Sequence, residues 1–220
     1  IITMGLMNYE KTLRGLQFMI SNASPLIYLS KLNKLDLLIN LFNRIEITQS
    51  VYDEIIYRED NYKPEVEIIK DFIDKELIVI EKLDEKMNEQ SNFIKKSFKL
   101  HTGESDTIAL ALQKRKKEVI IDEKYARKAA ELYGLFPIGT FGAILLAYKR
   151  NIISEQDVKN IVGGLISGNF RIGADVLNEF WKLFDLVKLE KIASKSKLTV
   201  KDAEDIGDKI KKRIAERHGL

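Results

Sequence analysis

The stretch EVIIDEKYARKAAELYGLFPIGT, residues 118–140, decides the fold because it places two strands around one helix. Its run at residues 119–121 is uniformly apolar, which is typical of a strand covered on both faces. Helical spacing follows over residues 124–133, and a short apolar run over 136–138 predicts the second strand. Parallel strands need a crossover connection of this kind, so the stretch predicts a βαβ unit.

The same alternation extends along most of the chain. Further strands are predicted at residues 18–22, 44–48 and 77–81. Helices are predicted at residues 25–31, 34–42, 49–58, 64–74, 84–98, 104–114, 141–150, 154–167 and 173–184. Strands that alternate with helices favour the α/β class with a parallel sheet. Ligands of such sheets bind beyond the carboxyl ends of the strands, so the residues that follow each strand are the first candidates for a functional site.

Composition limits the chemistry that the chain can carry. The 220 residues have a formal net charge of +3, which is too small to indicate a nucleic-acid binder by itself. The chain has no cysteine and two histidines, which disfavours thiolate nucleophiles, zinc–sulfur sites and a His-based triad. No apolar run approaches the roughly 20 residues of a membrane helix, and we expect a cytoplasmic protein that does not enter a membrane.

Three segments are predicted from the changes in composition. Residues 1–18 are polar and precede Met19, so we interpret them as an N-terminal extension. Residues 19–186 contain all the predicted strands and form the main domain. Residues 187–220 are rich in charge and have no aromatic residue, which predicts a linker followed by one amphipathic helix over residues 200–217. Its apolar stripe comprises Val200, Ala203, Ile206, Ile210 and Ile214.

Acidic and amide side chains recur where the strands end. Asn22 and Ser24 follow the first strand, and Asp122 directly ends a buried one. The acidic candidates are Glu54, Glu104, Asp106 and Asp122. Each has an ordinary alternative explanation, because acids are favoured in the first turns of helices and glutamates are commonly solvated. Several carboxylates that converge need a cation, and oxygen ligands without Cys or His favour Mg²⁺ or Mn²⁺ and phosphodiester hydrolysis.

Several ordered motifs over residues 19–186 resemble the PIN-domain ribonucleases. The matching stretches are MISNASPLIYLSKLNKLDLL, ITQSVYDEII and TGESDTIALALQKRKKEVIIDEKYARKAAELYGLFPIGTFGAILLAYKRNII. The branch that they resemble most is the VapC-type toxins of archaeal and bacterial toxin–antitoxin pairs. The resemblance implies a three-layer α/β/α sandwich with a central parallel sheet, to which the amphipathic C-terminal helix predicted from the tail is added. It also implies Mg²⁺- or Mn²⁺-dependent cleavage of RNA, and a homodimer.

The resemblance assigns roles to individual residues. The catalytic acids are Glu54, Glu104, Asp106 and Asp122, and the metal ligands are Asn22, Glu54, Asp106 and Asp122. Asn22 stands where the family commonly has Asp, and a neutral amide oxygen should bind a cation more weakly than a carboxylate. The substrate-binding candidates are Ser24, Lys124, Arg127 and Thr140. For Lys124 and Arg127 the alternative is a solvated helix face.

The tail resembles the C-terminal part of the small antitoxins that accompany these toxins. This leads to a hypothesis in which the tail helix, or a separate antitoxin, occupies an apolar groove and directs Arg213 or Arg217 at the carboxylates. The alternative is an ordinary C-terminal helix that buries one face. Two functions stay open from the sequence: a metal-dependent endoribonuclease of a toxin–antitoxin system, and a catalytically weak PIN-like module that binds RNA or protein.

Overall fold

The computed structural model describes residues 18–57, 64–168, 170 and 172–195. Five strands form one parallel sheet in the order β3-β2-β1-β4-β5. They are β1 (Met19–Ser21), β2 (Ile45–Thr48), β3 (Ile78–Glu81), β4 (Glu118–Ile120) and β5 (Phe136–Ile138). Each strand lies within one or two residues of its predicted position. The predicted α/β class with a central parallel sheet is confirmed.

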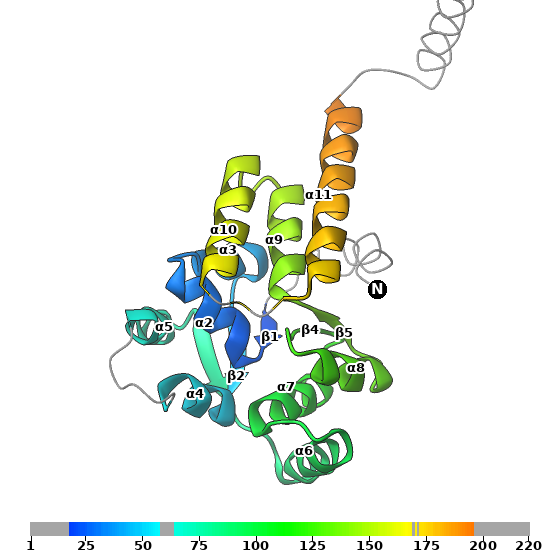
Figure 1. The fold of residues 1–220 in the computed structure, drawn as a ribbon. Coiled ribbons are helices and arrows are strands. Elements are labelled where there is room, and N and C mark those ends of the chain that lie inside the picture. Colours follow the sequence, from blue (N-terminus) through cyan, green and yellow to red (C-terminus); the bar gives the residue numbers. More distant parts are fainter. Residues whose placement is uncertain (1–17, 58–63, 169, 171, 196–220) are drawn as a thin grey trace, which may run out of the picture. The chain divides into compact units, whose positions relative to one another are not determined.

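Helices cover both faces of the sheet (Figure 1). The helices of the described residues are α2 (Ala23–Lys31), α3 (Asp36–Phe42), α4 (Gln49–Ile56), α5 (Pro64–Asp74), α6 (Glu85–Phe98), α7 (Thr102–Gln113), α8 (Lys124–Leu132), α9 (Thr140–Lys149), α10 (Glu155–Ser167) and α11 (Ala174–Lys195). Helix α7 packs on β1, β2 and β4 from one side, and α3 and α9 pack on β2 and β5 from the other. This arrangement is the predicted α/β/α sandwich.

The central strand β1 pairs with β2 and with β4. Ile20 lies opposite Glu46 on one side and Val119 on the other. The chain runs outward from β1 through β2 to β3, and then returns to add β4 and β5 on the opposite side of β1. The strand order therefore reverses beside β1, and such switch points are where open α/β sheets bind ligands. Asn22 and Asp122, which follow β1 and β4, stand at this point.

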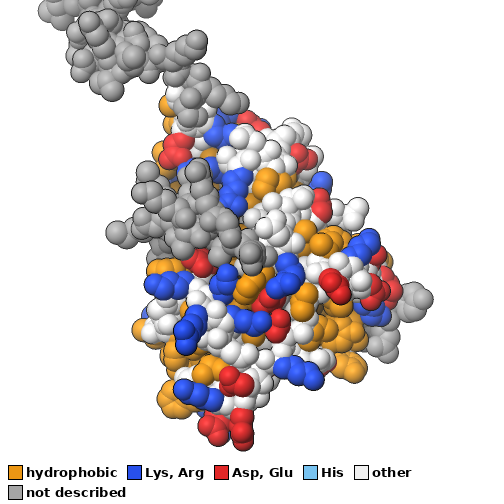
Figure 2. Space-filling model, turned by 180° about the vertical axis from the view of Figure 1, so that it is seen from behind, with side chains coloured by type: hydrophobic (Ala, Val, Ile, Leu, Met, Phe, Trp, Pro, Cys, Tyr) orange, Lys and Arg blue, Asp and Glu red, His pale blue; other side chains and the backbone are white. Residues whose placement is uncertain are grey.

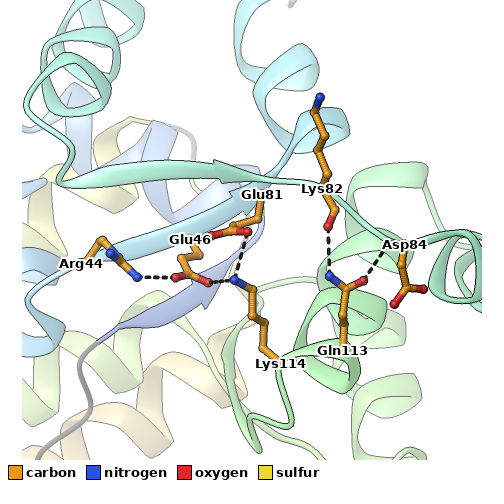
Figure 3. A network of polar contacts seen from close by, with 7 residues as sticks. All are labelled: Arg44, Glu46, Glu81, Lys82, Asp84, Gln113 and Lys114. Carbon is orange, nitrogen blue, oxygen red and sulfur yellow. Dashed lines mark hydrogen bonds and ion pairs between the residues drawn. The ribbon is translucent and has the colours of Figure 1, made fainter.

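A buried ion-pair network fixes the end of α7 to the sheet (Figure 3). Glu46 of β2 is fully buried, and its carboxylate lies 2.7 Å from Arg44 Nη2 and 3.4 Å from Lys114 Nζ. Lys114 directly follows α7 and also pairs with Glu81 of β3 at 3.0 Å. Burial disfavours the charged form of Lys114, but bonds to Glu81 and the charge of Glu46 outweigh that effect and raise its pKa. The other end of α7 carries Glu104.

The chain divides into two compact units, residues 1–180 and residues 181–220. In the first unit, Phe141 of α9 makes edge-to-face contacts with Phe170 and Phe180. In the second, Trp181 and Phe184 contact each other in the same way.

Among the described residues, no helix has the length and apolarity needed to cross a lipid bilayer. On the face shown in Figure 2, basic and acidic side chains are mixed, and neither kind forms a large patch of its own.

The largest difference from the sequence prediction is the length of the last described helix. Helix α11 does not end near residue 184 but continues to Lys195, through the segment predicted as a linker. Phe180 and Phe184 of this helix are buried. The predicted tail helix over residues 200–217 and the predicted extension, apart from Phe18, lie outside the described residues.

Candidate functional site

Asn22 carries an unpaired polar atom at the centre of the carboxyl edge of the sheet. Its backbone N–H donates to the Ile120 carbonyl at 3.1 Å, which extends the β1–β4 pairing by one residue. Asn22 is the N-cap of α2, yet its side chain caps no backbone N–H. The residue is 4% exposed, and its Oδ1 atom has no hydrogen-bond partner. A buried oxygen of this kind costs about 1–3 kcal/mol, and an ion or water that binds there removes the cost.

Glu54 reaches the same edge from α4. Thr48 caps α4 by accepting a hydrogen bond from the Val51 N–H at 3.4 Å, and this sets the helix directly after β2. Glu54 lies against Gly103 of α7, because a β-carbon at Gly103 would be only 2.9 Å from Glu54 Oε2. Only glycine leaves room for the carboxylate there. The partly buried Glu54 side chain is therefore held against the first turn of α7.

Glu104 lies in that first turn and is 8% exposed. Its Oε2 atom accepts a hydrogen bond from the His101 N–H at 2.9 Å and so caps the helix. Burial raises the pKa of Glu104, and the charges of Glu123 and Glu54 raise it further, against the lowering effect of His101. Glu104 thus sits in the negative field of two other carboxylates. A bound cation would reverse that field and favour the ionised form.

Asp122 is engaged by the start of α9. Thr140, the first residue of α9, donates its backbone N–H to Asp122 Oδ1 at 2.7 Å and its hydroxyl to Oδ2 at 2.6 Å. Although Asp122 is partly exposed as a residue, protein atoms crowd its carboxyl group. Desolvation raises the pKa of Asp122, and the Thr140 bonds and the Arg127 charge only partly offset it. Asp122 is therefore the cap of α9 as well as a candidate site residue.

The basic and hydroxyl candidates lie around Asp122 and Asn22. Arg127 Nη1 donates to the Ile121 carbonyl at 3.1 Å, and a β-carbon at Gly139 would lie 3.2 Å from it. Lys124 is exposed at the first position of α8. Ser24 is partly buried in the first turn of α2, two residues beyond Asn22. Of the four substrate-binding candidates, Thr140 is the one bonded to a candidate acid.

Asp106 bonds to serines on two neighbouring helices. Its Oδ2 atom accepts from Ser50 Oγ of α4 at 2.5 Å, and its Oδ1 atom accepts from Ser91 Oγ of α6 at 2.5 Å. Residues two apart on a helix are separated by about 200°, so Asp106 and Glu104 face opposite sides of α7. The carboxylate of Asp106 ties α4, α6 and α7 together. Its predicted roles as catalytic acid and metal ligand stay predictions.

The structure does not bring the four predicted acids into one cluster. Among the residues that it describes, no group of three or more Asp, Glu or His side chains is placed to share one metal ion. Glu54 and Glu104 are electrostatic neighbours, since the charge of Glu54 raises the pKa of Glu104, and Asn22 follows β1, on which α7 packs. We call these three residues the acidic site. One amide and two carboxylates suit Mg²⁺, which is commonly held by one or two carboxylates and keeps several waters.

Glu123 is an acidic neighbour that the sequence-based list of site residues omits. Its side chain caps α8 by accepting from the Ala126 N–H at 2.7 Å, and its charge raises the pKa of Glu104. The sequence signal was present, because Glu123 follows Asp122 at the end of β4. In the sequence, a role as N-cap is enough to explain Glu123. Its effect on the pKa of Glu104 was therefore not predicted.

Comparison with known proteins is consistent with this arrangement. A family model described as a PIN domain matches residues 18–185, which include all five strands and every candidate site residue. No curated protein matches the chain.

Proposed function

The chain belongs to the PIN-domain family, whose members are generally nucleases, and from that premise we propose that it is a Mg²⁺- or Mn²⁺-dependent endoribonuclease. The observation that carries the proposal is the buried, unpaired Oδ1 atom of Asn22 at the carboxyl end of β1, beside which we place the mutually close carboxylates of Glu54 and Glu104. An oxygen-only set of ligands is what a hard divalent cation prefers.

In this proposal Asn22, Glu54 and Glu104 hold the ion. When bound, a divalent ion supplies positive charge that polarises a phosphate and lowers the pKa of a water molecule. Gly103 keeps the Glu54 carboxylate against the first turn of α7, and the His101 N–H orients Glu104 through Oε2. These contacts fix both carboxylates before substrate arrives, which lowers the cost of reaching the reactive geometry.

The residues around Asp122 act on the substrate side. Asp122 is held by Thr140 and accepts a proton or orients a water molecule with its carboxylate. Lys124 and Arg127 contact the phosphate backbone, and the Ser24 hydroxyl hydrogen-bonds it from α2. Asp106 acts by positioning, because its bonds to Ser50 and Ser91 hold α4, which carries Glu54, against α7.

Metal titration and RNA cleavage on one set of variants test the proposal. The wild type should cleave RNA with Mg²⁺ or Mn²⁺ and lose activity in EDTA. Glu54→Gln and Glu104→Gln should each abolish cleavage and weaken Mn²⁺ binding measured by calorimetry. Asn22→Asp should bind Mn²⁺ more tightly, because it adds a charged ligand where the wild type has an amide. Cleavage that persists unchanged in both Gln variants would overturn the assignment.

A catalytically weak PIN-like module that binds RNA or protein is the second candidate function. Two observations favour it: the neutral amide of Asn22, and the lack of a three-acid group among the described side chains. The same assays separate the two functions. Under this alternative the wild type binds RNA without cutting it, and Asn22→Asp is the variant that gains cleavage.

We further propose that the protein is the toxin of a toxin–antitoxin pair, works as a homodimer, and is restrained by an antitoxin or by its own C-terminal residues. The support is the resemblance of the tail to antitoxins. Because α11 continues to Lys195, a truncation should remove residues 196–220 and leave that helix whole. Cleavage should then increase, and an unchanged rate would reject inhibition by the tail. Sedimentation of the full chain and of the truncated chain tests the dimer.

A further inference from the structure

Two tyrosines next to the candidate site residues are largely exposed. Tyr57 is 77% exposed and Tyr125 is 69% exposed. Each follows a candidate site acid by three residues: Tyr57 follows Glu54, and Tyr125 follows Asp122. Neither aromatic ring contributes to the core of the domain. An exposed aromatic next to a candidate site is a surface on which a flat ligand can stack.

The two tyrosines stand on different sides of β1. Tyr57 ends α4, the helix that follows β2, and Tyr125 lies in the first turn of α8, the helix that follows β4. In the sheet β1 lies between β2 and β4, and α7 packs against both α4 and α8. Figure 1 shows α4 and α8 separated by α7. The end of β1, which Asn22 of the acidic site follows, therefore lies between the strand ends that lead into the helices of the two tyrosines.

Positive charge accompanies Tyr125. On α8 the alanines at positions 126, 129 and 130 are buried, whereas Lys124 and Lys128 are exposed beside Tyr125. The exposed side of this helix thus offers an aromatic ring together with two cations. Single-stranded nucleic acids are bound by this combination, in which bases stack on aromatic rings and phosphates meet lysines.

We propose that Tyr57 and Tyr125 each stack an unpaired base of single-stranded RNA, and that the stretch of RNA between the two bases passes the acidic site. The inference rests on the proposed function and assigns two residues to the binding of bases. In a duplex the bases stack on each other, and their faces are not available to side chains. Sequence preference is weak in such a site, because every base has a face that can stack.

Binding of a fluorescent single-stranded RNA in EDTA, measured by anisotropy, tests the stacking without cleavage. Tyr57→Ala and Tyr125→Ala should each weaken binding by about 5- to 150-fold, the range for the stacking of one base. Tyr57→Phe and Tyr125→Phe keep the aromatic face and should bind as the wild type does. Phe93→Ala is the matched control, because Phe93 is 61% exposed on α6, which carries no candidate site residue.

The outcomes separate this inference from the proposed function. Weakened binding in both Ala variants supports stacking even if the wild type never cleaves RNA. Wild-type affinity in both Ala variants overturns stacking even if the wild type cleaves RNA. Equal affinity for the single strand and for a duplex of the same sequence, or an equal loss in Phe93→Ala, also overturns it. If only one Ala variant loses affinity for RNA, stacking on both tyrosines is overturned and only that tyrosine stacks a base.

Discussion

Thr140 bonds to both oxygens of the Asp122 carboxylate: its N–H donates to Oδ1 at 2.7 Å, and its hydroxyl donates to Oδ2 at 2.6 Å. The contact joins the end of β4 to the start of α9, so one side chain serves both the fold and the proposed chemistry. Gly139 makes it possible, because a β-carbon there would lie 2.9 Å from Asp122 Oδ1.

Thr140→Val tests how the hydroxyl bond to Asp122 contributes to the stability of the fold and to the proposed chemistry. The substitution keeps the shape of the side chain and removes the hydroxyl, so one charge-assisted bond is lost while the backbone bond stays. We expect a loss of about 1–3 kcal/mol in the free energy of unfolding, measured with urea. The pKa of Asp122 should rise further, because the lost bond favours the ionised form. Cleavage should fall most at low pH, where more of Asp122 would be protonated. A uniform fall at all pH values would show that the pKa of Asp122 is not the cause.

Gly103→Ala should displace the Glu54 carboxylate. The new β-carbon would lie 2.9 Å from Glu54 Oε2, so the carboxylate must shift from its present position. A shift of about 1 Å can cost about 100-fold in rate, and we expect a loss of that order in cleavage and weaker Mn²⁺ binding.

Gly163→Ala is the matched control for that change. Gly163 lies in α10, and a β-carbon there would meet no atom within 4 Å. Alanine is the better helix former, so this variant should gain about 1 kcal/mol in stability with unchanged cleavage. If Gly103→Ala cleaves RNA as well as Gly163→Ala does, the close contact with Glu54 has no functional role.

The stability of the metal-free protein should fall as the pH rises past the ordinary range of a glutamate. The pKa of Glu104 is raised above 4.5 in the folded chain, so the folded state binds more protons than the unfolded state between the two values. The free energy of unfolding therefore decreases with pH through that interval. Glu104→Gln should reduce the slope and be more stable than the wild type at neutral pH in EDTA.

Urea unfolding across about pH 4 to pH 8 measures this effect. A smaller decrease should remain in the variant, because the pKa of Asp122 is also raised. Added Mg²⁺ should restore stability to the wild type at neutral pH more than to Glu104→Gln. Identical slopes for the two proteins would show that Glu104 is not the group responsible.

Lys114→Met should destabilise the fold without reducing cleavage. The change leaves the buried Glu46 and the partly buried Glu81 without their shared cation. Breaking a buried pair costs about 3–5 kcal/mol, and we expect about 2 kcal/mol because Lys114 is partly exposed. Lys159→Met is the control: it removes a surface pair with Glu155 at 2.8 Å and should cost no more than about 0.5 kcal/mol. If the two variants lose the same stability, the burial of Glu46 does not explain the effect of Lys114→Met.

Periodicity was sufficient to predict the sheet, because short apolar runs and helical spacing are local properties of the chain. Residues 136–138 were predicted as a strand and form β5 without change. The end of α11 was missed for a local reason too. The boundary near residue 187 was placed where aromatic residues stop, but no glycine or proline interrupts residues 185–195, and charged residues continue a helix readily.

The composition of the site was predictable and its geometry was not. Strand ends identified Asn22 and Asp122, which flank the switch point. The opposite directions of Glu104 and Asp106 follow from helical spacing and could have been predicted. The bonds of Asp106 to Ser50 and Ser91, and the unpaired oxygen of Asn22, depend on how distant helices pack, and no local pattern encodes them.

The pairing of β1 with β4 has a consequence for synthesis on the ribosome. Asn22 and Asp122 flank one crevice but are separated by 100 positions along the chain, since 122 − 22 = 100. A nascent chain that has only released α7 already carries Asn22, Glu54 and Glu104, yet β1 still lacks the neighbour that covers one of its edges. Under the proposed function, incomplete translation products should therefore not cleave RNA until the second half of the message has been read.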